Sequence, residues 1–317
     1  MVPFTVILLI KFEKKQINRA KNHTLCEEIM EKIIKMNANT QLDGLCRFIP
    51  NLLFSYVDGK ELRMQMYIPV PRNKPAPMLV FLQGSGWTYP NVFEKLPMFA
   101  KFARDGIAVA MIVHRNRHEG FAAPAFLEDA KTAVRFLRAN AEKYNIDKEK
   151  IFFGGSSSGG NTALLMGQTG DDPRYKTKEY AEESDAVCGI IDACGPSDFI
   201  RFVNTYNRVN RDIDPIDDAF VHNFCGKGKT REERIALLSD MSPERVFAKN
   251  KVLLPTLIIH GVNDGTVPYS ESEAMYNTLK ESGCEVSFIS IDGSDHDFNM
   301  WSAELYDIIE NFILSHI

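Results

Sequence analysis

Residues 151–160, IFFGGSSSGG, lead from an apolar run into three serines that lie between two pairs of glycines. A second apolar run, residues 163–166 (ALLM), follows. A flexible glycine-serine spacer would lie between polar segments, so this stretch is predicted to be a turn from a buried strand into a helix. A phosphate-binding P-loop occupies a similar turn, but it needs a lysine and then Ser or Thr after its last glycine. Asn161 and Thr162 stand there instead, which disfavours phosphate binding.

The remaining reading of this turn is a nucleophile elbow, GxSxG, which lifts one serine above the end of a sheet. Small residues are required two positions before and after that serine, because the backbone folds tightly and the helix passes close to the strand. Ser157 has Gly155 and Gly159 at these positions, whereas Ser156 and Ser158 each have a serine at one of them. Ser157 is therefore the candidate nucleophile.

Strand-like and helix-like segments alternate on both sides of the turn, from about residue 62 onward. We expect strands at residues 63–70, 77–82, 107–113, 150–153, 186–193, 256–260 and 285–291. We expect helices at 92–104, 124–144, 270–282 and 303–314, with a further helix beginning near Ser158. This alternation predicts an α/β fold with a mostly parallel sheet between helices, and functional loops at the C-terminal ends of its strands.

The domain organisation follows from the length of the chain and from one segment that interrupts the alternation of strands and helices. A chain of 317 residues with 44% hydrophobic residues can bury one large core, which we place in residues 51–317 as a single catalytic domain. Residues 1–50 are expected to be an N-terminal extension with a helix at 25–36. Residues 197–250 show no core strand and are rich in Asp and Asn, so we predict that they form a cap or lid over the strand ends.

A reactive serine needs a base and an acid, and in this fold they follow it in the order Ser, Asp or Glu, His. The expected strand at 256–260 runs into HGVNDGTVP, which contains Asp264, and the strand at 285–291 runs into DGSDHDF, which contains His296. Both loops are predicted to open on the same rim as Ser157. His296 could then take the Ser157 proton while Asp264 fixes the tautomer of the imidazole.

Other acids and histidines fit these roles less well. The aspartates that lie too near His296 in sequence to orient it from across the rim are Asp292, Asp295 and Asp297. Asp240 lies in the expected cap and is a weak runner-up. Taken alone, Asp264 could equally be a turn-forming aspartate in NDG. His260 is expected inside the strand end, as a core or turn histidine.

The oxyanion of an acyl-transfer reaction needs backbone donors from two places in this fold. One is the N–H of Ser158, the residue after the nucleophile. The others should come from the loop after strand 77–82, which reads QGSGW, and the candidates are Ser85 and Gly86, although a simple glycine turn would also explain them. The candidate substrate-binding aromatic residues are Trp87, Tyr89 and Trp301, any of which could instead be core.

Composition narrows the possible partners and the compartment. Lys and Arg total 37 against 42 Asp and Glu, a net charge of −5, so we expect neither nucleic acid nor an anionic membrane as partner. The 6 cysteines are too sparse for a disulfide framework. The apolar run at residues 2–10 is too short to span a bilayer and lacks the flanks of a signal peptide. We therefore expect a soluble, cytoplasmic protein without stable membrane insertion.

Four of these segments, QGSGW, GSSSGG, HGVNDGTVP and GSDHDF, together resemble the α/β-hydrolase superfamily over about residues 60–317. The resemblance is to its serine esterases, which include acetylxylan esterases, feruloyl esterases and hormone-sensitive-lipase-like carboxylesterases. It implies ester hydrolysis through the triad of Ser157, His296 and Asp264 and an acyl-enzyme, with no metal and no organic cofactor. The implied substrates are short-chain acyl esters, or acetyl and feruloyl esters linked to plant polysaccharides, as small molecules or oligosaccharides.

The sequence departs from this family at two points. The family usually has His-Gly-Gly-Gly-Trp where this chain has a loop beginning at Gln83, with Ser85 in place of a glycine. The family also often has Asp-Ser-Ala at the elbow, where this chain has three serines, so a charge is lost at Ser156. Gln83 can still donate and accept hydrogen bonds, and Ser85 adds a hydroxyl.

Two alternatives remain open. A peptidase of the prolyl-oligopeptidase type uses the same triad, although the chain has no room for the propeller that usually accompanies it. A hydrolase fold without catalysis could serve as a binding protein, but such a protein would be expected to have lost a triad residue.

Overall fold

The computed structural model describes residues 35–42, 44–70, 74–206 and 213–317 of the chain. The chain divides into two compact units, Met1–Leu42 and Asp43–Ile317. In the first unit, the described residues 35–42 form no helix or strand. The apolar run at 2–10 and all but the last two residues of the helix expected at 25–36 lie outside the described residues.

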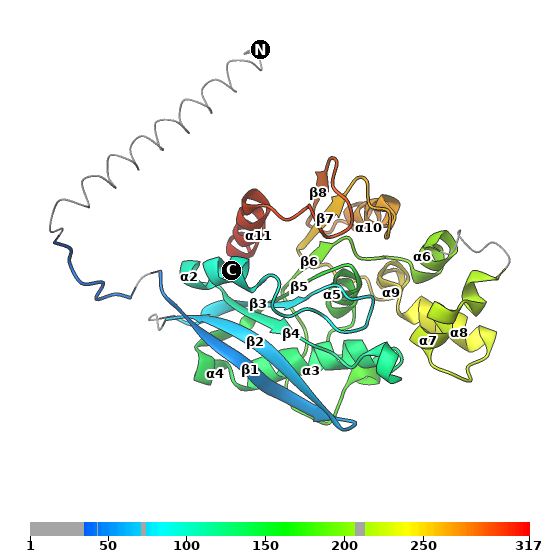
Figure 1. Ribbon diagram of the computed structural model, residues 1–317, viewed down its shortest axis with the longest axis horizontal. Coiled ribbons are helices and arrows are strands. Elements are labelled where there is room, and N and C mark those ends of the chain that lie inside the picture. The colour runs from blue at the N-terminus through cyan, green and yellow to red at the C-terminus, as the bar shows by residue number, and fades with distance from the viewer. Residues whose placement is uncertain (1–34, 43, 71–73, 207–212) are drawn as a thin grey trace, which may run out of the picture. The chain divides into compact units, whose positions relative to one another are not determined.

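The second unit is built on a sheet that has eight strands within the described ranges, in the order β1-β2-β4-β3-β5-β6-β7-β8 (Figure 1). The strands are β1 (Cys46–Val57), β2 (Lys60–Pro69), β3 (Ala76–Leu82), β4 (Ala108–Ile112), β5 (Ile146–Ser156), β6 (Gly189–Ala193), β7 (Thr256–Gly261) and β8 (Val286–Ile291). β2 pairs antiparallel with β1 and with β4, and every other neighbouring pair is parallel. The predicted mostly parallel sheet is confirmed, and β1 is an addition that the sequence analysis missed.

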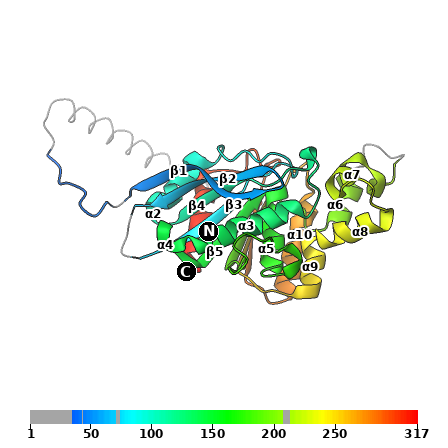
Figure 2. The same cartoon turned by 90° about the horizontal axis from the view of Figure 1, so that it is seen from below.

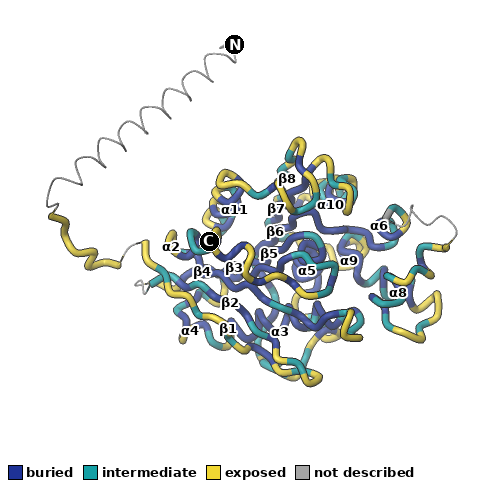
Figure 3. Tube along the Cα trace, in the orientation of Figure 1, coloured by how far each residue is buried: buried dark blue, intermediate teal, exposed yellow. Residues whose placement is uncertain are grey.

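Helices cover both faces of this sheet because successive side chains of a strand point to opposite sides. Leu79 and Phe81 of β3 belong to one apolar cluster, with α2 (Leu96–Asp105) and α11 (Ala303–Ser315). Met78 and Val80 belong to the other, with α3 (Ala125–Ala139), α5 (Ser158–Gln168) and α10 (Tyr269–Glu281). Figure 3 shows that the central strands and α5 are largely buried.

The single helix expected at 124–144 is two helices, because α3 ends at Ala139 and the short α4 (Ala141–Tyr144) begins after Asn140. Both helices remain on the same side of the sheet. Among the described residues, none of the helices combines the length and the apolar character needed to cross a membrane.

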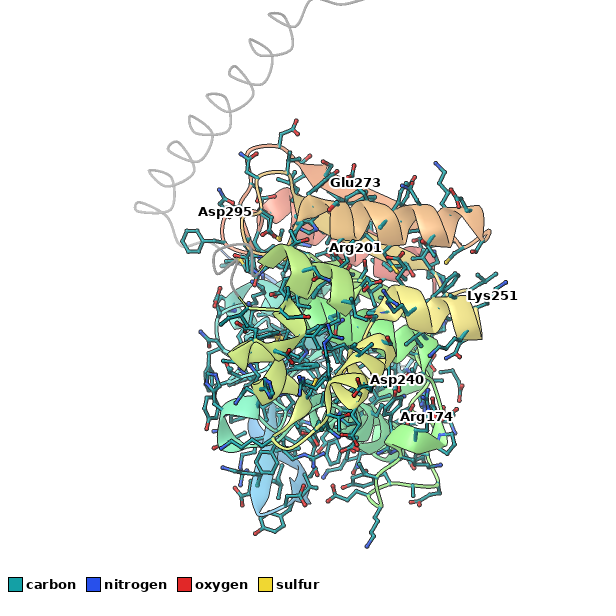
Figure 4. The ribbon with its side chains drawn as sticks, turned by 90° about the vertical axis from the view of Figure 1, so that its right-hand side faces the viewer. Arg174, Arg201, Asp240, Lys251, Glu273 and Asp295 are labelled. Carbon is teal, nitrogen blue, oxygen red and sulfur yellow. The ribbon has the colours of Figure 1, made fainter. Side chains whose placement is uncertain are left out.

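Most of the described residues between 197 and 250 are helical, with short turns between the helices. They contain α6 (Phe199–Tyr206), α7 (Ala219–Cys225), α8 (Arg231–Asp240) and α9 (Pro243–Asn250), and Figure 2 shows α6, α7 and α8 gathered at one end of the second unit. Arg201 of α6, labelled in Figure 4, reaches Glu271 of α10 at 2.7 Å and Glu244 of α9 at 2.8 Å. These ion pairs fix α6 to the helices that pack on the sheet.

The turn between β5 and α5 requires glycine for reasons of space. A Cβ atom on Gly159 would lie 1.9 Å from the Leu82 carbonyl oxygen of β3, and one on Gly155 would lie 2.3 Å from the Gly159 backbone. The close approach of strand and helix that was predicted from GGSSSGG is therefore present, and it sets Ser157 at the end of β5.

Replacing Gly159 by alanine should lower the free energy of unfolding by at least about 3 kcal/mol, because the methyl group meets rigid backbone of a central strand. Gly265→Ala is the matched control, since a Cβ at Gly265 meets nothing within 4 Å, and its effect should stay within about 0.5 kcal/mol. Urea denaturation of the two variants measures both values. Equal stability of Gly159→Ala and wild type would contradict the tight turn.

Candidate active site

Ser157 lies at the tip of the turn in a conformation that few residues adopt. Its φ is +53° and its ψ is −119°, and its N–H donates to the Ala193 carbonyl of β6 at 2.7 Å. Such strained backbone persists only where the surroundings hold it in place, and it clusters at functional sites. The strain here turns a half-buried hydroxyl away from the sheet, as a nucleophile elbow requires.

His296 lies between Ser157 and Asp264. Its Nε2 is 2.8 Å from the Ser157 Oγ, and its Nδ1 is 2.6 Å from the Asp264 Oδ2. The three side chains come from the ends of β5, β7 and β8, so residues far apart in sequence meet at one edge of the sheet. The structure thus brings together the three residues that the sequence placed in a triad.

The carboxylate of Asp264 is fully buried and accepts hydrogen bonds on both oxygens. Oδ1 accepts from the N–H groups of Thr266 and Val267, each at 2.8 Å, and Oδ2 accepts from His296 and from His260 at 3.0 Å. Burial alone would raise the pKa of Asp264, but the bonds from the two histidines outweigh burial and hold it well below its usual range. Asp264 therefore stays ionised as a partner for an imidazolium.

His260 is a member of this arrangement that the sequence analysis assigned only to the core. Its Nε2 faces two acceptors, Asp264 Oδ2 and the Val267 carbonyl at 3.1 Å, so this nitrogen carries the proton. Its Nδ1 then accepts from the Ser272 hydroxyl at 2.7 Å. The spacing of four residues between His260 and Asp264, across a strand end and a turn, was the available signal.

The three predicted oxyanion donors, Ser158, Ser85 and Gly86, differ in the hydrogen bonds that they make. The Ser158 N–H is in the first turn of α5, where backbone N–H groups have no partner within the helix. Gly86 has a φ of +59°, and its carbonyl accepts from the Arg117 Nε at 2.8 Å. The Ser85 N–H instead donates to the Ser158 Oγ at 2.9 Å. Of the two loop candidates, Ser85 is thus already engaged by the side chain of Ser158.

The three candidate substrate-binding aromatic residues differ in how far they are buried. Trp87 is 4% exposed and packs against aromatic residues of α6 and α7, with ring centroids 4.9 Å from Phe199 and 5.0 Å from Phe224. Trp301 stacks on Tyr306 of α11 at 5.5 Å and is partly buried against the apolar cluster that includes α2. Trp87 therefore packs in the core and Trp301 packs against it, whereas Tyr89 is 66% exposed.

One group of side chains has the spacing of metal ligands, within the ranges that the structure describes. Cys194, Asp264 and His296 each offer a ligand atom, and these atoms lie within 4.8 Å of one another. The Cys194 thiol is buried, which raises its pKa well above the usual value and disfavours the thiolate that a metal would need. Asp264 and His296 already bind each other, so the group fits a hydrogen-bonded triad better than a metal centre.

A serine on a strained turn, aligned with a histidine and a buried aspartate at the strand ends of a largely parallel sheet, defines the α/β-hydrolase class. The chain has this fold, as the sequence predicted. The sequence model of the BD-FAE family matches residues 64–279, which is more than half of the chain, and the chain belongs to that family.

Known proteins place the family among esterases. The chain is 28% identical over 241 residues to esterase LipC of Mycobacterium tuberculosis, covering 72% of this chain and 54% of LipC. It is 42% identical over 234 residues to endo-1,4-β-xylanase B of Butyrivibrio fibrisolvens, covering 74% of this chain and 32% of that protein. A truncated carbohydrate esterase from gut microbiota superimposes with a TM-score of 0.71 at 25% identity, covering 89% of this chain and 99% of that one.

The matched curated relatives are longer proteins. The chain spans about half the length of LipC and about a third of the xylanase. The structural match, in contrast, covers nearly the whole of the gut carbohydrate esterase. The predicted membership in the α/β-hydrolase esterases is confirmed by the family and by these relatives.

Proposed function

We propose that this chain is a serine carboxylesterase in which Ser157 is the nucleophile, His296 the general base and acid, and Asp264 the residue that orients His296. The observation that carries the proposal is the unbroken line from Ser157 Oγ to His296 Nε2 at 2.8 Å and from His296 Nδ1 to Asp264 at 2.6 Å. A nucleophile and a base within hydrogen-bond reach, with the base held by a third group, is the arrangement that nucleophilic catalysis requires.

In the proposed reaction, the Ser157 oxygen attacks the ester carbonyl and its proton passes to His296 Nε2. The N–H groups of Ser158 and Gly86 bind the oxyanion of the tetrahedral intermediate, and His296 returns the proton to the departing alcohol. Water then gives a proton to His296 and attacks the acyl-enzyme, releasing the acid and restoring the Ser157 hydroxyl. Of the two predicted loop donors, Ser85 and Gly86, we assign the role to Gly86, because the Ser85 N–H is bound to Ser158 Oγ.

For the substrate, we propose short acyl esters, with acetyl or feruloyl groups on plant polysaccharides as the physiological class. The 42% identity to part of a protein named a xylanase and the likeness to a carbohydrate esterase support a polysaccharide ester. Trp87 of the QGSGW loop packs closely against Phe199 and Phe224, and we take this packing as support for a compact acyl group over a long alkyl chain.

The acyl preference can be measured with 4-nitrophenyl esters. We expect kcat/KM for the acetate to exceed that for the octanoate by about 10-fold or more, because a site for short acyl groups binds the transition state less well with each added methylene. Release of acetate from acetylated xylan and of ferulate from methyl ferulate then separates the two polysaccharide esters. A preference for long chains would overturn the acyl assignment, and faster cleavage of a matched 4-nitroanilide would favour a peptidase.

A further inference from the structure

Asp297 follows His296 directly, but its side chain binds residues of two other segments and not the triad. Its φ of +52° lies in the left-handed region. Its Oδ2 accepts from the Gln83 Nε2 at 2.8 Å and from the Ser156 Oγ at 2.8 Å. One oxygen of Asp297 thus joins the loop after β3 to the nucleophile elbow.

The other oxygen of Asp297 binds a second pair of groups. Oδ1 accepts from the Trp301 Nε1 at 2.6 Å and lies 3.6 Å from the Lys95 Nζ. The Lys95 side chain is 4% exposed and lies over the Trp301 ring, 4.1 Å from its centroid. Burial lowers the pKa of Lys95, and the charge of Asp297 opposes that effect. The carboxylate is therefore an anionic partner of a buried cation, together with Glu94 at 3.9 Å from the same Nζ.

The hydrogen bond from Ser156 to Asp297 also leaves the Ser156 oxygen free to accept a hydrogen bond from the loop that carries Gly86. Because the Ser156 proton goes to Asp297, the Ser156 oxygen is left as an acceptor, and the Gly84 N–H donates to it at 3.1 Å. A Cβ on Gly84 would lie 2.7 Å from the Ser157 Cβ, so the loop lies directly against the nucleophile. Asp297 therefore fixes the distance between the loop and the elbow through Gln83 and Ser156.

We propose that Asp297 is a positioning residue for the oxyanion hole. It holds the loop of residues 83–86 next to Ser157, so that the N–H groups of Gly86 and Ser158 can donate to the same oxyanion. The proposal rests on the esterase function proposed above. It also accounts for two residues at which the chain departs from the family pattern, because Gln83 and Ser156 both bind the Oδ2 atom of this carboxylate. The charge that the family often carries at position 156 is here supplied from the loop that bears the catalytic histidine.

The first test compares Asp297→Asn with Asp292→Asn, which removes an exposed carboxylate from the same loop. With active sites counted from the burst of 4-nitrophenol, kcat for 4-nitrophenyl acetate should fall by roughly 10- to 100-fold in Asp297→Asn, with KM within about 2-fold. The reason is that an oxyanion hole acts on the transition state and not on the bound ester. Asp292→Asn should behave as wild type.

Gln83→Leu separates positioning from stability. The Gln83 Oε1 is buried without a hydrogen-bond partner in the described part of the chain, so leucine removes an unsatisfied atom as well as the donor to Asp297. We expect Gln83→Leu to unfold within a few degrees of wild type and yet to show a kcat lowered by about 10-fold. This variant also serves if Asp297→Asn does not fold.

The decisive experiment moves the carboxylate from position 297 to position 156, where the family often has an aspartate. Ser156→Asp alone places a second carboxylate beside Asp297, and Asp297→Asn alone removes the carboxylate that Gln83 and Ser156 bind, so both single variants should lose kcat. The double variant Ser156→Asp/Asp297→Asn again has one carboxylate and should recover at least about 10-fold over the worse single variant.

Unchanged kcat per active site in Asp297→Asn, or a double variant no better than its worse parent, would overturn the positioning role. The proposed esterase function would be untouched by either result, provided that Ser157→Ala is inactive. If Ser157→Ala kept its activity, the esterase mechanism itself would fall. The two failures are therefore distinguishable.

Discussion

A Ser157→Ala variant should lose kcat for 4-nitrophenyl acetate by about 10⁴-fold or more, while its unfolding temperature stays close to that of the wild type. Alanine keeps the Cβ and therefore fits the same backbone at a φ of +53°. Only the oxygen that lies 2.8 Å from His296 is removed. The loss is measured by steady-state kinetics on protein whose folding is checked by circular dichroism.

The neighbouring serines cannot replace Ser157, because both hydroxyls are buried and engaged. The Ser156 Oγ donates to Asp297, and the Ser158 Oγ accepts from the Ser85 N–H. Ser282→Ala, at an exposed position after α10, is the control and should keep wild-type kinetics. A fluorophosphonate adduct should form on Ser157 in wild type. An adduct on Ser156 or Ser158, or activity within 10-fold of wild type in Ser157→Ala, would contradict the assignment.

The nucleophile turn could be predicted from sequence because its requirements are local. The space around Gly155 and Gly159 is set by the turn itself and by the adjacent strand, so a seven-residue pattern contains nearly all the information. The joint position of Asp264 and His296 was predictable for a related reason. Parallel strands place their C-terminal ends on one edge, so loops that follow such strands meet.

The contacts that the sequence did not predict depend on the orientation of side chains that lie far apart in the chain. Asp297 lies too near His296 in sequence to orient it from across the rim, yet its carboxylate binds Gln83, which lies 214 positions away in sequence. The engagement of Ser85 depends likewise on the rotamer of Ser158. Trp87 follows a glycine loop, which is a typical place for a pocket residue, but α6 and α7 cover it.

The strand β1 was missed for a different reason. It pairs only with β2 at the border of the sheet, and its residues are partly exposed along most of its length, so its apolar pattern is weak. Strands buried on both faces, such as β3 and β4, read as continuous apolar runs and were placed within one or two residues.

Asp264→Asn should lower kcat by about 10⁴-fold at neutral pH, because the surroundings of this side chain dictate how an amide must lie. Two backbone N–H groups, from Thr266 and Val267, point at Oδ1, so the amide oxygen must face them and the NH₂ group must take the place of Oδ2. That NH₂ group then donates toward His296 Nδ1, which must become an acceptor, and the imidazole proton moves to Nε2. His296 would present a hydrogen to Ser157 where the reaction needs a lone pair.

This tautomer switch is directly measurable. The ¹⁵N shifts of His296 should report a proton on Nδ1 in wild type and on Nε2 in Asp264→Asn. Asp240→Asn, which alters a partly exposed carboxylate of α8 that pairs with Lys249, is the control and should change neither the tautomer nor kcat. The opposite amide orientation is disfavoured because backbone N–H groups cannot give up their protons, whereas imidazoles can relocate theirs. A wild-type tautomer in an inactive Asp264→Asn would show that Asp264 acts through its charge and not by orienting the ring.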